Sequence, residues 1–204
     1  RLIEIAKAVG PLQIILAGKA HPNDNLGFTF INEMMDKVDR LGDKNYDMLK
    51  IVILENYDIY LGRILTSGVD LWLNNPYPPF EASGTSGMKA ILNGVVQMTT
   101  SDGWVVEAED KGIGKIFGYR YSDGKIGNEF DRSMKDDAQE LYRGLEEIAA
   151  LYYSTFKNNL SSKWIDMMIN CVATGAHFNT YRMLDEYKKL IWDSCLEKER
   201  ALKV

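Results

Sequence analysis

The chain has 204 residues, of which 46% are hydrophobic and 26% charged, and its net charge is −5. This composition is ordinary for a globular protein with one good-sized core, and the negative charge argues against nucleic acid as the main partner. No apolar run reaches the ~18 residues of a membrane span, so no membrane partner is expected. The two cysteines, Cys171 and Cys195, lack metal-ligand spacing, and we expect reduced structural thiols in a cytoplasmic protein.

The first 120 residues alternate between strand and helix patterns. Strands are expected over residues 12–17, 50–54, 69–73 and 95–99, with two further short strands at 104–107 and 113–117. Helices are expected over residues 1–9, from a cap at Asn23 or Asp24 to about 40, over 59–66 and over 88–93. The run at 12–17 is continuously apolar, which suits a parallel strand buried on both faces. The alternation predicts an α/β fold with a doubly wound, Rossmann-like parallel sheet in a three-layer αβα sandwich.

Helical patterns dominate the rest of the chain. Residues 136–156 are interpreted as a long helix, whose apolar stripe contains Leu141, Leu145, Ile148 and Tyr152. Two more helices are expected over residues 163–174 and 181–202, the second capped by Asn179 or Thr180. No repeat or boundary interrupts the pattern, so residues 1–204 are interpreted as one domain with C-terminal helices from about 136.

Residues suited to ligand binding follow three of the predicted strands. Lys19 and His21 follow the first strand, residues 55–57 the second, and residues 81–89 the third. Parallel sheets of this type bind ligands at the carboxyl ends of their strands. We therefore expect the three loops to lie at one edge of a single sheet.

The strongest candidate site is residues 81–93, Glu-Ala-Ser-Gly-Thr-Ser-Gly-Met-Lys-Ala-Ile-Leu-Asn. Its small residues lead into a helix start, where free N–H groups suit phosphate or sugar oxygens. Lys89 is placed in the first turn of that helix, which is a poor position for a cation. It is therefore expected to be paired or to be a free amine suited to Schiff-base chemistry. The alternative is the commoner one, a solvated surface lysine.

Other residues of the site have two interpretations each. Glu81 either caps the helix or holds a sugar hydroxyl, and the two are about even. Ser83, Thr85 and Ser86 either cap the helix or bind an oxyanion, and one residue can do both. Tyr57 either ends its strand or contacts a ligand at the sheet edge.

Several common catalytic patterns are absent from the sequence. There is no His/Cys cluster for zinc, and no metal site is expected. There is no Gly-x-Ser-x-Gly elbow, Walker loop or strand-linked Gly-x-Gly-x-x-Gly. Hydrolase triads, P-loop ATPases and standard dinucleotide enzymes therefore rank low.

The run from Glu81 to Lys89 resembles the α-glucan phosphorylases, which comprise the glycogen, starch and maltodextrin phosphorylases. In that family a Glu-Ala-Ser-Gly-Thr-x-x-Met-Lys run carries the lysine that binds pyridoxal phosphate as an imine. Further segments resemble the family in the same order: Gly18-Lys19-Ala20, Glu55-Asn56-Tyr57, Leu92-Asn93-Gly94 and Asp102-Gly103. The segment at 178–183, Phe-Asn-Thr-Tyr-Arg-Met, resembles the tail of the shorter bacterial and archaeal type.

The resemblance implies a cofactor site. Lys89 would bind the pyridoxal phosphate and be catalytic, and Thr85 and Ser86 would bind the cofactor's phosphate. Tyr57 would contact the pyridoxal, and Asn74 would lie near the cofactor.

The resemblance also implies a sugar site beside the cofactor. Glu81, as a second catalytic residue, would bind glucosyl hydroxyls together with Ser83 and Gly84. The implied reaction is reversible phosphorolysis of α-1,4-glucan, such as glycogen or maltodextrin, by inorganic phosphate to give glucose 1-phosphate. The cofactor's phosphate, whose second pKa is about 6, would exchange a proton with inorganic phosphate.

The family fold implied is GT-B, a glycosyltransferase architecture of two facing Rossmann-like domains. This chain would be most of the C-terminal, cofactor-binding domain, cut from a longer chain. The N-terminal domain and the basic segment that holds substrate phosphate would be missing, so the isolated chain is expected to be inactive. The final helix would then expose apolar surface. The resemblance leaves a homo-oligomer open.

Two alternatives remain. One is a nucleotide-sugar glycosyltransferase of the same architecture, such as a glycogen synthase, in which a second glutamate follows the first by eight positions to hold the donor's ribose. Lys89 stands at that position here and cannot accept hydroxyl protons as a carboxylate does. The other alternative is a glucan-binding module without catalysis.

Overall fold

The computed structural model describes residues 1–41, 47–118, 120, 134–158 and 163–202. Within this part of the chain, five strands form two parallel sheets. The strands are β1 (Leu12–Ala17), β2 (Leu49–Leu54), β3 (Leu71–Asn74), β4 (Val96–Thr100) and β5 (Gly114–Phe117). β1 pairs with β2, and the second sheet has the order β3-β4-β5. The prediction of an α/β fold with parallel strands is confirmed.

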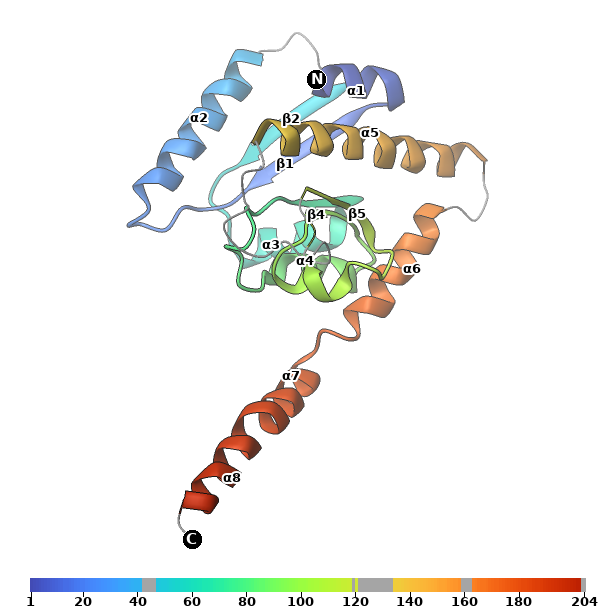
Figure 1. The fold of residues 1–204 in the computed structure, drawn as a ribbon. Helices are drawn as coiled ribbons and strands as arrows, with labels where there is room; N and C mark the ends of the chain where they lie inside the picture. The colour runs from blue at the N-terminus through green and yellow to red at the C-terminus, as the bar shows by residue number, and fades with distance from the viewer. Residues whose placement is uncertain (42–46, 119, 121–133, 159–162, 203–204) are drawn as a thin grey trace.

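Helices account for most of the remaining chain. They are α1 (Leu2–Val9), α2 (Asn25–Leu41), α3 (Ile59–Gly68), α4 (Thr85–Leu92), α5 (Met134–Asn158), α6 (Lys163–Gly175), α7 (Thr180–Tyr187) and α8 (Asp193–Leu202). A 3₁₀ helix, η2 (Gly103–Ala108), precedes β5, and a π-helical segment, η4 (Lys188–Trp192), joins α7 to α8. Figure 1 shows β1 and β2 with α1 and α2 at one end, β3–β5 with α3 and α4 in the middle, and α7–α8 leading away from the body.

Side-chain caps explain where several helices begin. Asp24 accepts a hydrogen bond from the Gly27 N–H at 2.8 Å, so the cap of α2 is Asp24, one of the two predicted. Asp58 caps α3 in the same way through the Leu61 N–H at 2.8 Å. The predicted cap at Asn179 is confirmed by its bond from the Arg182 N–H at 2.9 Å.

The core lies around β4, which is buried along its whole length. On one side it includes Ile91, Trp104, Val105, Ala108, Ile113, Ile116 and Cys171. On the other, the predicted stripe of α5 packs against Val96, Met98 and Phe117. Cys171 and Cys195 are free thiols, and burial raises the pKa of Cys171 to about 12, as expected of a structural thiol.

Three expectations for the strands are wrong. β1 is not buried on both faces, because its residues alternate between partly buried and exposed and α2 buries none of its own residues against the sheet. In the described part of the chain, β1–β2 form a sheet of their own, so the loops after β1 and β2 do not share a sheet with the loop after β3. Residues 104–107 are not a strand but lie in η2, because Asp102 accepts from the Gly103 N–H and Trp104 and Val105 are buried.

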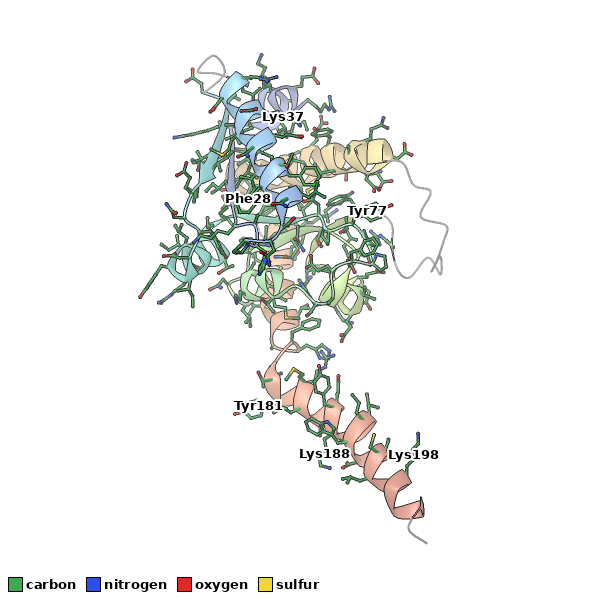
Figure 2. All side chains as sticks on the ribbon, turned by 90° about the vertical axis from the view of Figure 1, so that its left-hand side faces the viewer. Phe28, Lys37, Tyr77, Tyr181, Lys188 and Lys198 are labelled. Atoms are coloured by element: carbon green, nitrogen blue, oxygen red, sulfur yellow. The ribbon has the colours of Figure 1, made fainter. Side chains whose placement is uncertain are left out.

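The C-terminal extension, α7–η4–α8, exposes a large apolar surface, as expected. Its exposed large apolar residues are Tyr181, Met183, Leu184, Tyr187, Leu190, Ile191, Trp192 and Leu196. Figure 2 shows Tyr181, Lys188 and Lys198 along this extension, apart from the side chains of the body. In the part of the chain described, no helix is both long and apolar enough to cross a bilayer.

Candidate active site

Helix α4 is the element on which the candidate site is built. It begins at Thr85 rather than near Met88, and its N-cap is Gly84 at φ 75°. Lys89 therefore lies in the last turn and not in the first. The expectation of a cation at a helix N-terminus is wrong, because the small residues that precede Met88 are themselves helical. In the last turn the helix dipole favours a cation.

The two faces of α4 have different characters. Gly87, Ala90 and Ile91 are buried against the core. Thr85 and Lys89 are exposed on the opposite side, one helical turn apart, and Ser86 beside them is partly buried. The structure therefore places on one helix three of the five residues expected at the cofactor, the other two being Tyr57 and Asn74.

The Lys89 side chain is exposed to solvent. Among the described residues, none forms a hydrogen bond or an ion pair with it. The backbone carbonyl of Lys89 accepts from Asn93 Nδ2 at 2.8 Å, which closes the end of α4. The expectation of a charged partner for Lys89 therefore finds no support in the described residues.

Glu81 is held by its neighbours rather than by α4. Asn74, the last residue of β3, donates from Nδ2 to both Glu81 carboxylate oxygens, at 3.2 and 3.4 Å. No side chain caps α4, so the interpretation of Glu81 as a helix cap is wrong. A β-carbon placed on Gly84 would lie 1.8 Å from Glu81 Oε1, so only glycine leaves room for the carboxylate in front of the helix.

Asp102, to which the sequence assigned no role in the site, is important for this geometry. Asp102 is 7% exposed, and its carboxylate accepts from the backbone N–H groups of Glu81 and Gly103, each at 2.9 Å. The next residue, Trp104, donates its backbone N–H to the Ser83 carbonyl at 3.0 Å. The Asp-Gly pair is typical of a turn, but the sequence does not indicate that Asp102 binds the backbone of Glu81, about twenty residues earlier.

Three other residues predicted near the ligand, Tyr57, Lys19 and His21, form their described contacts away from α4. Tyr57 is partly buried, and its hydroxyl lies over Gly62 of α3, where an added β-carbon would be 2.6 Å from it. Helix α3 packs against α4, but among the described residues no hydrogen bond joins Tyr57 to α4. Lys19 is exposed, and His21 Nδ1 accepts from the Asn23 N–H at 3.2 Å within its own turn. These two residues lie in the loop that follows β1, and among the described residues no hydrogen bond joins them to α4.

The donor set around α4 fits pyridoxal phosphate. The uncapped first turn supplies backbone N–H groups and the hydroxyls of Thr85 and Ser86 for a phosphate. The exposed Lys89 amine, on the same face, suits an aldehyde. Within the described residues no group of histidine, cysteine and carboxylate side chains is arranged to hold a metal ion.

These features define a class: an α/β protein with parallel strands and, after β3, a helix that has an uncapped first turn and an exposed lysine in its last turn. Comparison with known proteins specifies it further, because residues 3–161 match the family model for carbohydrate phosphorylase. The chain belongs to the carbohydrate phosphorylase family.

Similar proteins carry consistent names. The chain is 39% identical over 188 residues to the maltodextrin phosphorylase of Thermococcus litoralis, which covers 91% of this chain and 21% of that protein. It is 37% identical over 193 residues to the glycogen phosphorylase of Aquifex aeolicus, covering 93% of this chain and 26% of the relative. For the glycogen phosphorylase of Mycobacterium tuberculosis the identity is 35% over 181 residues, covering 87% and 20%. The chain thus spans a fifth to a quarter of the length of these relatives.

Proposed function

We propose that this chain is the cofactor-binding part of a cytoplasmic α-glucan phosphorylase. The reaction is the reversible phosphorolysis of α-1,4-glucan, such as glycogen or maltodextrin, by inorganic phosphate to glucose 1-phosphate. The observation that carries the proposal is one side of α4, where Thr85 and Ser86 lie in an uncapped first turn and Lys89 lies one turn further along the helix. The names of relatives that are 35–39% identical support the same reaction.

In this proposal α4 binds both the phosphate group and the aldehyde group of pyridoxal phosphate. The first-turn N–H groups and the hydroxyls of Thr85 and Ser86 hold its phosphate, and Lys89 binds its aldehyde. When bound, the cofactor supplies a phosphate that exchanges a proton with the substrate phosphate near neutral pH. Tyr57 contacts the pyridoxal ring in the same proposal.

The sugar is proposed to bind at the loop before α4. Glu81 accepts hydrogen bonds from glucosyl hydroxyls, with Ser83 and Gly84 beside it. The Asn74 amide and the Asp102 carboxylate hold the Glu81 side chain and backbone, which supports a fixed orientation for this carboxylate.

The architecture proposed for the whole enzyme is GT-B, with residues 1–204 in its C-terminal Rossmann-like domain. The substrate phosphate then meets the α4 site from a part of the enzyme outside these residues. We therefore expect no phosphorolysis by the isolated chain.

The rival function, glycosyl transfer from a nucleotide sugar, is disfavoured by Lys89. A ribose site needs a carboxylate acceptor at that position, and here an amine stands on the exposed face of α4. The described residues offer no observation that favours a non-catalytic glucan-binding module over the enzyme.

The test is to map where the cofactor is attached in the full-length protein. Incubation with pyridoxal phosphate, reduction with borohydride and peptide mass spectrometry should find the phosphopyridoxyl group on Lys89. Lys89→Arg should lose the label, because a guanidinium does not form the link. The matched control is Lys37→Arg, an exposed lysine on α2, which should keep it (Figure 2). An unlabelled Lys89 in active full-length protein would refute the proposal.

A further inference from the structure

The buried face of α4 lies unusually close to a tryptophan. A β-carbon placed on Gly87 would be 3.0 Å from both Cζ2 and Nε1 of Trp104 and 3.2 Å from Oε1 of Gln97. Carbon atoms in contact normally lie about 3.5–4.0 Å apart. The absence of a side chain at Gly87 therefore lets α4 seat directly on the indole ring.

Trp104 has little freedom to move away from α4. It is 4% exposed, and its backbone N–H is bonded to the Ser83 carbonyl. Its ring also contacts the ring of Phe178 edge to face, with centroids 5.2 Å apart. The indole is thus fixed both by the loop that leads into α4 and by the segment between α6 and α7.

Phe178 is itself held by charged groups. The Arg182 guanidinium lies over its ring at 5.4 Å from the centroid and forms ion pairs with Glu107 of η2 and Glu186 of α7. Through these contacts the base of the C-terminal extension holds Phe178 against the tryptophan.

We propose that Trp104 is a positioning residue for the cofactor site, and that Gly87 is its required counterpart. The inference rests on the proposed function, since the groups positioned are Thr85, Ser86 and Lys89. Gly87 follows Ser86 and precedes Lys89 by two residues, so it lies on the face of the same short helix that is turned away from the cofactor groups. Any tilt of α4 away from the indole moves all three groups together.

The direction in which Gly87→Ala changes cofactor binding distinguishes a contact with Trp104 from an effect of helix propensity. Gly87 has no positive φ, and alanine is normally more favourable than glycine inside a helix. Propensity alone therefore predicts that Gly87→Ala improves the helix. The Trp104 contact predicts the opposite for cofactor binding, because the added methyl pushes α4 off the ring.

The test measures cofactor attachment in the full-length protein and four variants. These are Gly87→Ala, Trp104→Leu, the double variant, and the control Gly68→Ala, a glycine in α3 whose added β-carbon would meet nothing within 4 Å. The readout is the pyridoxal phosphate concentration that half-labels Lys89 on borohydride reduction, at a temperature where circular dichroism shows each variant folded. Trp104→Phe replaces Trp104→Leu if the latter does not fold.

Gly87→Ala should raise the half-labelling concentration about five-fold or more, and Gly68→Ala should leave it unchanged. The double variant should return to within about two-fold of Trp104→Leu alone, because the smaller side chain makes room for the methyl. The inference is overturned if Gly87→Ala is half-labelled at the same pyridoxal phosphate concentration as the wild type. It is also overturned if the fold-increase of that concentration in the double variant equals the product of the fold-increases in the two single variants.

A wild-type protein that never takes the label contradicts the proposed function instead. The rate of reductive methylation of Lys89, followed by mass spectrometry, then decides the inference without any cofactor. A rate altered in Gly87→Ala and restored in the double variant supports the positioning role. Equal rates in all variants refute it.

Discussion

Asp102 organises the candidate site although no chemistry is assigned to it. Its buried carboxylate joins the start of the 81–93 segment to the turn that opens η2, through the N–H groups of Glu81 and Gly103. Hydrogen bonds to a charged acceptor are stronger than neutral ones, and a buried N–H without an acceptor is costly. The Asp-Gly turn could be predicted from the sequence, but its partner Glu81 could not, because the contact is long-range.

Removing this carboxylate should destabilise the chain. Asp102→Ala leaves two backbone donors without their acceptor, and we expect it to lower the free energy of unfolding by about 2–3 kcal/mol. The control is Asp110→Ala, whose side chain is 80% exposed and whose loss should leave the free energy of unfolding nearly unchanged. Urea unfolding followed by circular dichroism measures the free energy of unfolding of both variants. Equal losses in the two variants would show that the hydrogen bonds to Asp102 do not stabilise the chain.

Individual elements differ in how well the sequence predicts them. β1 and β2 were predicted within one residue, because their long apolar runs between polar turns leave little choice. The sequence predicts the start of α4 about one turn too late, since Gly87 has low helix propensity and, in the structure, packs against Trp104. The sequence predicts a strand where η2 lies, because Trp and Val favour strands, whereas burial and the Asp102 cap favour the 3₁₀ helix.

The division of the strands into two sheets is not predicted by the sequence pattern. A hydrophobic pattern indicates that a segment is a strand, and helical connections indicate parallel pairing. Neither indicates which strand lies beside which, so the separation of β1–β2 from β3–β5 could not be predicted. The α4 residues were brought together as expected, since they are neighbours along one helix.

The elements also differ in how much stability they provide. Ile91 on α4 is fully buried, whereas Leu190 in η4 is 73% exposed. In the 204-residue chain, Ile91→Ala should lower the free energy of unfolding by about 3 kcal/mol through lost burial and a cavity. Leu190→Ala, the matched aliphatic control, should change it by less than about 0.5 kcal/mol. Comparable losses in urea unfolding would show that the C-terminal extension packs on the body.

At the scale of the whole molecule, the chain is a body with an exposed helical extension (Figure 1). The body contains the α4 site, and the extension presents apolar residues that the described residues do not cover. Relatives four to five times longer support the proposal that further segments complete the active site. The family is established by the match over residues 3–161, while the activity is proposed for the longer protein.

The most direct test of the central claim is a product assay on the full-length protein. Maltodextrin and inorganic phosphate, with pyridoxal phosphate present, should yield glucose 1-phosphate. Lys89→Ala should abolish the product, and Lys37→Arg should leave it unchanged. Glucose 1-phosphate formed equally well by Lys89→Ala, or no glucose 1-phosphate together with glucosyl transfer from a nucleotide sugar, would contradict the account.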